Sequence, residues 1–400
     1  MDRELTTEII VSDLPHALTS QASQSAPEFT TASLAPLTGT VHVLIQFDVC
    51  EEIRLDELRK IFGAQTEKAS FKHQAPGYVR YQRPPVEEAL DPLVLEGGER
   101  LRGEIKYYDY GVVSVGFELP FNGDWDTLIQ LSSRWVWDTN FEKLASRIVK
   151  QKLEQAAPAL VKPYSALPDF KDWLQEDYFI FHLREIAGSP SAADLLASQG
   201  ARIAQIVRGE TVTLSDGERQ EILQSRISYY QTDLTVIGWN AAFIYDNDAG
   251  AEPALQLLQY ANSQLLEFRY YDELLTNELE GVYDFLENGG TGLWSRWRTA
   301  RAASKLHTVL LDVNELTERA DNAIKFLSDM FSARLYKLAA QKVGVPDYKD
   351  LVKEKLQTAE ELYRFMVDQF HQSRAFVLEF LVVIILIIEL FWLFKGSLRI

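Results

Sequence analysis

Cysteine is almost absent from this chain of 400 residues, which contains only Cys50. A single cysteine cannot form a disulfide within the chain, and it cannot supply the ligands of a cysteine-based zinc site. No histidine lies close to Cys50 in the sequence, so a buried inert thiol is the expected role rather than a nucleophile. The rarity of cysteine agrees with a reducing compartment.

Cations are also scarce: 40 Lys and Arg residues stand against 58 Asp and Glu residues, which gives a formal net charge of −18. Because phosphate contacts depend on Lys and Arg, this balance argues against direct nucleic-acid binding. It also repels anionic lipid headgroups, so attachment to a membrane would have to rely on apolar insertion. The hydrophobic content of 46% is ordinary for a packed core, and the length allows two domains.

Signatures of catalysis are missing as well. The sequence contains no GxxxxGK(S/T) loop, no GxGxxG after a strand and no GxSxG elbow. Its six histidines form no HxxxH or HExxH pattern, so a metal site lacks support. We therefore expect no catalytic residues, no cofactor and no metal. The alternative is a ligand-binding or enzymatic α+β domain, which a cleft containing carboxylates or histidines with shifted pKa values would favour.

One long hydrophobic run is present, and it lies near the C-terminus. Residues 375–394 read AFVLEFLVVIILIIELFWLF, between Arg374 and Lys395. Twenty helical residues span about 30 Å, the hydrocarbon thickness of a bilayer. We expect a single-pass transmembrane helix here, followed by a short tail over 395–400. The first residues lack the pattern of a signal peptide, so we expect the soluble body on the cytoplasmic side of the membrane.

Glu379 and Glu389 lie inside this run, where a charge costs at least about a few kcal/mol. On a straight helix they lie about 80° apart, so they share one stripe of its surface. This stripe favours self-association, with protonated or cation-paired glutamates at a helix–helix interface and a homo-oligomer as the result. Two alternatives remain open: both glutamates snorkel toward opposite headgroups, or they line a pore or proton path.

The residues before the run divide into three parts. Residues 1–38 are rich in Ser, Thr and Ala and are expected to form a disordered arm. Residues 39–248 interleave strand and helix patterns, which favours an α+β domain with an open sheet. Residues 250–374 carry long helical patterns with short glycine-rich breaks, and they predict a long antiparallel helical hairpin with coiled-coil packing. The last of these helices is expected to continue into the membrane.

Local patterns predict the individual elements of the α+β domain. Alternating and β-branched residues indicate strands, while apolar residues at helical spacing after a capping residue indicate helices. Gly111 can adopt the positive φ that the turn of a tight hairpin requires. The predicted strands are 41–47, 78–81, 104–108, 112–117, 178–183, 234–237 and 242–245, and the predicted helices are 55–62, 125–155, 192–207 and 216–224.

One basic cluster interrupts the acidic background of the chain. Residues 294–305 contain four cations and no carboxylate. One interpretation is ion pairing with acidic residues of the preceding helix, such as Glu278. The other is contact with a partner, phosphate or lipid headgroups, with tryptophans at the interface. The residues concerned are Trp294, Arg296, Trp297, Arg298, Arg301 and Lys305.

Two segments resemble a known family. The segment 105–115, IKYYDYGVVSV, looks like the YGxVV hairpin of the "required for meiotic nuclear division" family, and 378–389, LEFLVVIILIIE, is similar to that family's C-terminal ending. Phe380 stands where the family usually has tryptophan. The resemblance, to a bacterial-type member, implies a membrane-anchored, oligomeric, non-catalytic protein. We therefore predict a tail-anchored scaffold or adaptor that contacts an unidentified protein partner.

Overall fold

The computed structural model describes residues 36–63, 67–68, 84–95, 97–163, 173–288, 301–311, 313–314, 317 and 330–397. The chain splits into two compact units, Met1–Leu34 and Ala35–Ile400, and all described residues belong to the second. Most of the expected arm and the expected strand 78–81 lie outside the described residues.

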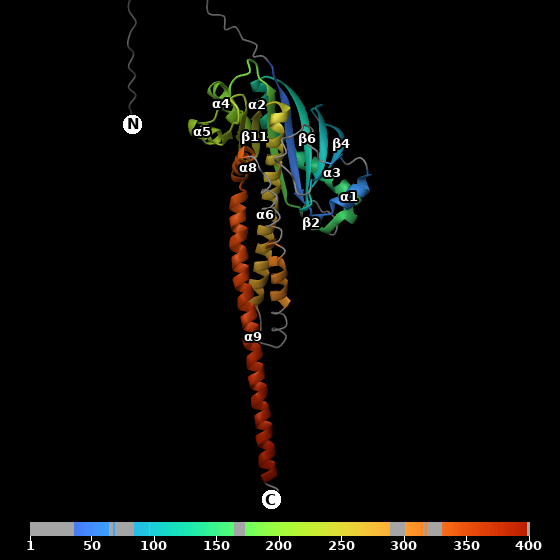
Figure 1. Cartoon of the computed structure of the whole chain (residues 1–400), viewed down its shortest axis with the longest axis vertical. Helices are drawn as coiled ribbons and strands as arrows, with labels where there is room; N and C mark the ends of the chain where they lie inside the picture. The colour runs from blue at the N-terminus through green and yellow to red at the C-terminus, as the bar shows by residue number, and fades with distance from the viewer. Residues whose placement is uncertain are drawn as a thin grey trace, which may run out of the picture. The chain divides into compact units, whose positions relative to one another are not determined.

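A nine-stranded sheet forms the centre of the described unit (Figure 1). Its strands follow the order β3-β4-β5-β6-β1-β8-β11-β10-β9, and among the described strands only β8 and β11 pair in parallel. Two further strands, β2 and β7, pair separately. The strands are β1 (Leu37–Asp48), β2 (Cys50–Ile53), β3 (Glu67–Lys68), β4 (Val86–Val94), β5 (Arg100–Tyr107), β6 (Val112–Gly123), β7 (Leu160–Pro163), β8 (Gln175–Glu185), β9 (Arg226–Ile227), β10 (Leu234–Ile237) and β11 (Ala241–Tyr245).

The two faces of this sheet carry different sets of helices, because successive side chains of a strand point to opposite sides. Val43, Ile45 and Phe47 of β1 join a core with the first group of helices, whereas Leu44 joins the core of α6. The first group comprises α1 (Leu55–Phe62), α2 (Trp125–Ser133), the π-helix η2 (Arg134–Asp138), α3 (Phe141–Ala156), the short 3₁₀-helix η3 (Ala157–Ala159), α4 (Ala192–Arg208) and α5 (Asp216–Gln224).

Three long helical elements form the rest of the described unit. Helix α6 (Asp248–Asn288) packs against β1 and β8 and then against α8 (Met330–Val343) and α9 (Val345–Ser397). Gly344, at φ 94°, separates α8 from α9. Farther along α6, Leu279 and Val282 form a second core with residues 301–311 and with Ala359 and Met366 of α9. Residues 301–311 are helical.

The prediction of a mixed α and β protein with an open sheet is confirmed. Helices 55–62 and 216–224 agree with the structure to the residue, and the hairpin turns at Gly111 as expected. The single helix expected over 125–155 is wrong. It begins as predicted, since Asp124 accepts a hydrogen bond from Thr127 N at 2.8 Å. It breaks after η2, because Asn140 caps a new helix by accepting from Lys143 N at 3.0 Å.

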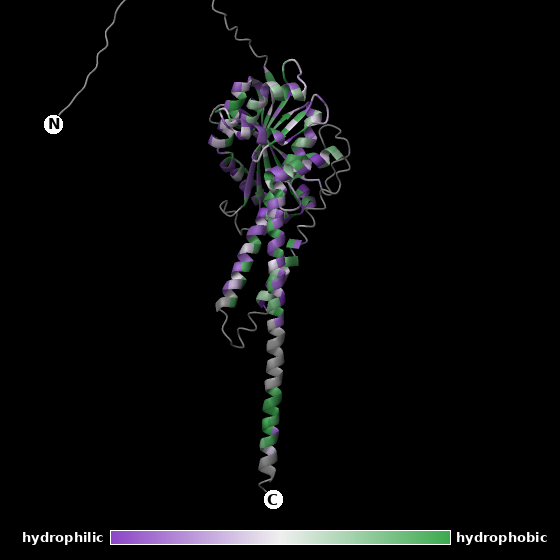
Figure 2. Cartoon of the chain, turned by 90° about the vertical axis from the view of Figure 1, so that its left-hand side faces the viewer, coloured by the Kyte–Doolittle hydropathy of each residue, from purple (hydrophilic) through white to green (hydrophobic). Residues whose placement is uncertain are grey.

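The expected transmembrane helix over 375–394 is not found. No helix in the part of the chain that the structure describes is long and apolar enough to cross a membrane. Helix α9 itself continues through this range to Ser397. The side chains of 369–380 and 393–397 are outside the description, so the apolar part that is described covers 381–392, which is hydrophobic in Figure 2.

Candidate functional site

A pocket of about 240 Å³ opens where the sheet meets η2 and the start of α3. Ile45 from β1 and Phe179 from β8 form part of its wall. Asp177 from β8 and residues 136–142 supply the rest, and the latter include the extended link at Thr139, φ −99° and ψ 120°. The interruption of the α2–α3 helix therefore creates the pocket, and single π-helical turns often lie at functional sites.

Three carboxyl groups line this pocket: Asp138, Glu142 and Asp177. Burial raises the pKa of Asp177 above its ordinary value, and the negative charge of Glu142 raises it further. None of the three forms an ion pair with a Lys or Arg among the described residues. The pocket therefore has an excess of negative charge, and a bound cation would relieve it.

An exposed tryptophan lies beside these carboxyl groups. Trp137 lines the pocket and is 62% exposed, and its indole Nε1 donates a hydrogen bond to Gly209 O at 3.0 Å. An indole face next to carboxylates suits an ammonium or guanidinium group. The lining contains no histidine, cysteine or lysine. The arrangement can therefore bind a cation, and beside its carboxylates the lining offers one hydroxyl, that of Thr139, which donates a hydrogen bond to Arg134 O at 3.1 Å.

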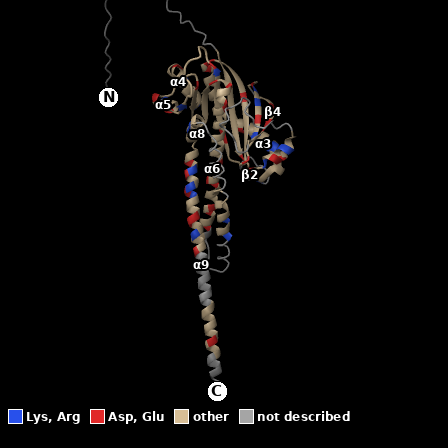
Figure 3. Cartoon of the chain, viewed as in Figure 1, with Lys and Arg blue, Asp and Glu red and all other residues tan. Residues whose placement is uncertain are grey.

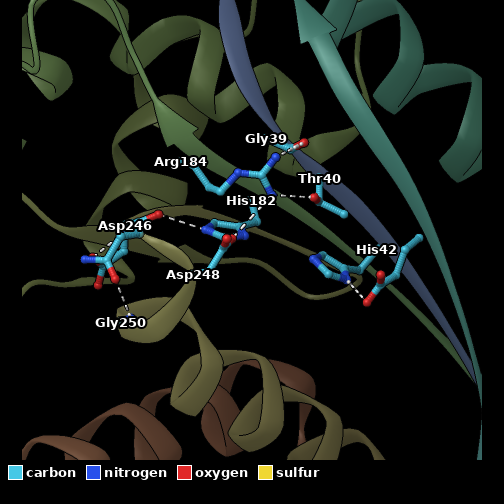
Figure 4. Close-up of polar contacts among 10 residues, drawn as sticks. Gly39, Thr40, His42, His182, Arg184, Asp246, Asp248 and Gly250 are labelled. Atoms are coloured by element: carbon cyan, nitrogen blue, oxygen red, sulfur yellow. Dashed lines mark hydrogen bonds and ion pairs between the residues drawn. The ribbon is translucent and has the colours of Figure 1, made fainter. Parts of the chain in front are cut away.

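A second polar group lies where α6 begins, and Figure 4 shows its contacts. Arg184 on β8 donates to Thr40 Oγ1 at 2.9 Å and to Gly39 O at 3.2 Å, and it lies 3.3 Å from Asp248 Oδ1. His182 Nε2 lies 2.8 Å from Asp246 O, which makes it the donor.

Burial lowers the pKa of His182 to about 4, so its ring is neutral near neutral pH. Its neighbour His42 lies 3.5 Å from Glu118. Within the described chain no group of three or more His, Cys, Asp or Glu residues could hold a metal ion. We interpret this polar group as an anchor for α6, because its contacts join β1 and β8 to the start of that helix.

The basic cluster predicted from the sequence is only partly visible. Trp294, Arg296, Trp297 and Arg298 lie outside the described residues. Arg301 and Lys305 lie on the helical segment 301–311, and Lys305 Nζ is 2.7 Å from Glu278 Oε1. This ion pair agrees with the first interpretation for Lys305. The same contact places the segment beside the second half of α6.

The residues predicted at the membrane lie along the last part of α9. In Figure 3 the described side chains of this part, 381–392, include the acidic Glu389 and no Lys or Arg. Helix α9 passes through Arg374, Glu379 and Lys395, whose side chains are not described. Glu389 is described and exposed. Apart from Glu389, residues 381–392 are entirely apolar, and their side chains are between 37% and 67% exposed.

Sequence reasoning missed the pocket, although a signal was available. Asn140 is a strong N-cap residue inside the expected helix 125–155, and it indicates that a new helix starts there. No sequence pattern indicates that Asp177, which lies on β8, is close to the residues between α2 and α3. The contact between them depends on the order of the strands, which a single sequence does not reveal.

Fold and site together define a mixed α/β domain with a polar pocket. A helical extension formed by α6, residues 301–311, α8 and α9 follows it. Residues 38–252 match the family model described as "Uncharacterized protein MJ0711, N-terminal domain". This range is more than half of the chain, so the protein belongs to that family. A relative, "Uncharacterized protein MJ0711" of Methanocaldococcus jannaschii, is 18% identical over 242 residues, which cover 60% of this chain and 71% of the relative.

No solved structure matches the chain. The matches support membership of an uncharacterised family and indicate no catalytic function. They do not support the resemblance to the meiotic-division family or its C-terminal anchor. The family model ends at residue 252, so it covers the sheet and the start of α6 but not the helical extension.

Proposed function

We propose that this protein is a non-catalytic scaffold or adaptor that the C-terminal part of α9 attaches to a membrane, with the α/β domain on the cytoplasmic side. The observation that carries the proposal is the exposed apolar segment 381–392. Exposed apolar surface of this extent requires a cover in a stable protein. In the sequence the segment belongs to the longer apolar run 375–394, and α9 is continuous through it.

The distribution of this apolar surface favours lipid over a protein groove. Eight consecutive residues from Leu381 to Ile388 are apolar and exposed, and eight residues complete more than two helical turns. The segment is therefore apolar on every side, which is typical of a helix inside a membrane or a large core. A groove on a partner would cover only one side of it.

Vesicle flotation tests the attachment. We expect the full chain to float with phosphatidylcholine vesicles and to resist alkaline extraction, whereas a chain that ends at Arg374 should do neither. Leu386→Arg should weaken flotation, because it places a charge among the apolar residues. Val212→Arg is the matched control, since Val212 is similarly exposed but lies in the α/β domain. Flotation of the shortened chain, or none by the full chain, would contradict the proposal.

We also propose that the protein associates with a second copy of itself through α9. Leu351 and Phe365 are exposed on the part of α9 before the apolar run, at 43% and 51%. They are two heptads apart, the spacing of residues that meet a parallel helix. Light scattering in detergent should show an oligomer that Phe365→Ala weakens, and Glu379→Leu with Glu389→Leu should weaken it as well. A monomer would contradict self-association, and an oligomer that none of these changes affects would contradict an interface on α9.

A second candidate function is ligand binding by the α/β domain. The pocket with Asp177 and Glu142 favours it, because it contains carboxyl groups and burial raises the pKa of Asp177 above its ordinary value. Its expected ligand is a small cation such as an amine. Calorimetric titration with putrescine at constant ionic strength should show binding that Asp177→Asn weakens and Glu154→Gln, an exposed carboxylate on α3, leaves unchanged. Equal effects of the two substitutions would indicate attraction by the net charge alone.

A further inference from the structure

Two buried carboxyl groups from distant parts of the chain meet where α6 lies on the sheet. Asp48 is the last residue of β1 and is 1% exposed. Glu267 lies on α6 and is 2% exposed. Asp48 pairs with Val112 of β6, and Val112 packs against Leu266, the residue before Glu267, so the two carboxyls lie in one buried region and repel each other.

Most of the oxygen atoms in this site lack a hydrogen-bond partner. Both carboxyl oxygens of Asp48 and Oε1 of Glu267 have none in the described chain. Oε2 of Glu267 accepts a hydrogen bond from the hydroxyl of Tyr271, one turn farther along α6. An ionised carboxylate buried without such partners costs several kcal/mol, so a group in this position retains its proton instead.

The surrounding groups do not supply a positive charge. Asp109, in the turn between β5 and β6, adds negative charge beside Glu267, and Cys50 on β2 lies near Asp48. Arg269 is the cation closest to Glu267 along α6. Its guanidinium pairs with Glu176 and donates to a carbonyl of β8. On the third element that packs there, Lys355 of α9 pairs with Asp272.

We infer that Asp48 and Glu267 share at least one proton at neutral pH, and that this proton is required for α6 to lie closely on the sheet. A proton on either carboxyl removes one negative charge and turns an unpartnered oxygen into a hydrogen-bond donor. Loss of the proton leaves two negative charges in a buried site, and their repulsion pushes α6 away from β1. The inference concerns the contact between sheet and helix, so it does not depend on membrane attachment.

Two hydrogen bonds between the sheet and α6, about two helical turns before Glu267, join neutral groups and do not change with pH. Gln46 Nε2 donates to Gln259 O at 3.0 Å, and Gln259 Nε2 donates to Ser114 Oγ at 2.9 Å. All three side chains are buried. Between the end of β1 and α6, the pH dependence therefore comes from the pair formed by Asp48 and Glu267, and these two hydrogen bonds add none.

The pH range follows from the direction of the pKa shifts. Burial raises the pKa of Asp48 well above its ordinary value, and it raises the pKa of Glu267 to about 8. In the unfolded chain both carboxyl groups have a pKa of about 4. Between these limits the folded protein holds more protons than the unfolded chain, so stability is greatest at the acidic end and decreases as the pH rises toward about 8.

Infrared difference spectroscopy of the full chain tests whether the proton is present. We expect the carbonyl stretch of a protonated carboxylic acid at about pH 6, and its loss by about pH 9. Glu267→Gln and Asp48→Asn should each change this signal, while Glu273→Gln should not, because Glu273 is an exposed carboxylate on the same helix. A wild-type spectrum without this band, or a band that neither substitution changes, would overturn the inference.

Thermal unfolding tests the coupling to stability. The wild type and Glu273→Gln should both lose thermal stability between about pH 6 and about pH 9. The double variant D48N/E267Q cannot ionise at this site, so most of that loss should disappear. If this variant fails to fold, the single variant Asp48→Asn supplies the comparison. An equal loss in the wild type and in the folded variants would overturn the inference.

Discussion

The turn at Gly111 permits a quantitative test of the contacts between the β5–β6 hairpin and residues 49–53. Gly111 has φ 97°, and a Cβ at this position would lie 1.7 Å from the carbonyl oxygen of Cys50. The turn also accepts two hydrogen bonds, from Val49 N to Gly111 O at 3.2 Å and from Ile53 N to Asp109 O at 3.0 Å. Gly111→Ala therefore strains the backbone and displaces the segment that carries these bonds.

The expected cost is a sum of two effects. A non-glycine residue in this left-handed region costs roughly 1–2 kcal/mol. Each of the two hydrogen bonds contributes roughly 0.5–1.5 kcal/mol, and the close approach to Cys50 O requires both to change. Gly111→Ala should therefore cost about 2–5 kcal/mol. Since the obstructing atom belongs to the backbone, rotation of a side chain cannot relieve it.

Two other glycines separate these effects. Gly98 has φ 83°, but a Cβ there would meet nothing within 4 Å, so Gly98→Ala should cost only the roughly 1–2 kcal/mol of backbone strain. Gly217 lies in α5 without positive φ and with open space, so Gly217→Ala should stabilise by roughly 0.4–1 kcal/mol.

Thermal unfolding of the full chain in one detergent compares the three variants. The predicted order of midpoints, from lowest to highest, is Gly111→Ala, Gly98→Ala, wild type and Gly217→Ala. Equal midpoints for Gly111→Ala and Gly98→Ala would refute the reasoning, because the approach to Cys50 would then have no cost. A loss for Gly217→Ala as large as that for Gly98→Ala would show that backbone conformation does not determine the ranking.

Three other measurements follow from buried contacts. Burial lowers the pKa of His182 to about 4, so the thermal midpoint should fall as the pH decreases from about 6.5 toward 4, and His182→Asn should reduce this fall. Lys355 Nζ lies 2.5 Å from Asp272 Oδ1. Urea unfolding should therefore show that Lys355→Met lowers stability by about 1–3 kcal/mol. The control Lys353→Met, which changes an exposed lysine on the same helix, should not lower it. Met366 is fully buried, so Met366→Ala should cost about 2–5 kcal/mol and speed proteolysis of α9.

The elements that the sequence predicted well are those specified by nearby residues. Helix α5 follows Ser215, whose hydroxyl accepts from Glu218 N, and its bounds agree with the prediction. The hairpin at Gly111 has the same kind of local signal. Strand β4 was missed because Pro92 argues against a strand, and the pairing of β4 with β5 indeed shifts register between Leu90 and Leu93.

The order of the strands in the sheet could not be predicted from the sequence, for a physical reason. Strand β1 pairs with both β6 and β8, and β8 pairs in parallel with β11. These choices depend on which faces pack together after the chain has folded, and the alternation of residues within one strand does not specify its neighbour. The pocket beside Asp177 and the pair formed by Asp48 and Glu267 both depend on these choices.

Helix α6 shows which buried residues the periodicity of the sequence can predict and which it cannot. The long helical pattern predicted after residue 250 has an apolar stripe that includes Leu258 and Phe268, and both side chains are buried. The structure also buries polar residues on other sides of the helix, among them Asn262, Gln264 and Glu267. The reason is that α6 is covered by the sheet on one side and by α8 and α9 on another. A helix covered twice buries more than one stripe, and sequence periodicity identifies only the apolar one.

Helix α6 contacts the sheet at several points along its length, and two of them depend on charged or titratable groups far apart on the helix. Arg184 and His182 hold its start through Asp248 and Asp246, while the carboxyl pair acts farther along, at Glu267. At about 1.5 Å per residue the two points lie about 28 Å apart, and two points fix the direction of a helix. Loss of the shared proton weakens only the contact at Glu267, while Gln259 and Arg269 still bind β1 and β8, so α6 should shift locally rather than detach. Because α9 packs along α6, a local shift of α6 would also change its contacts with α9.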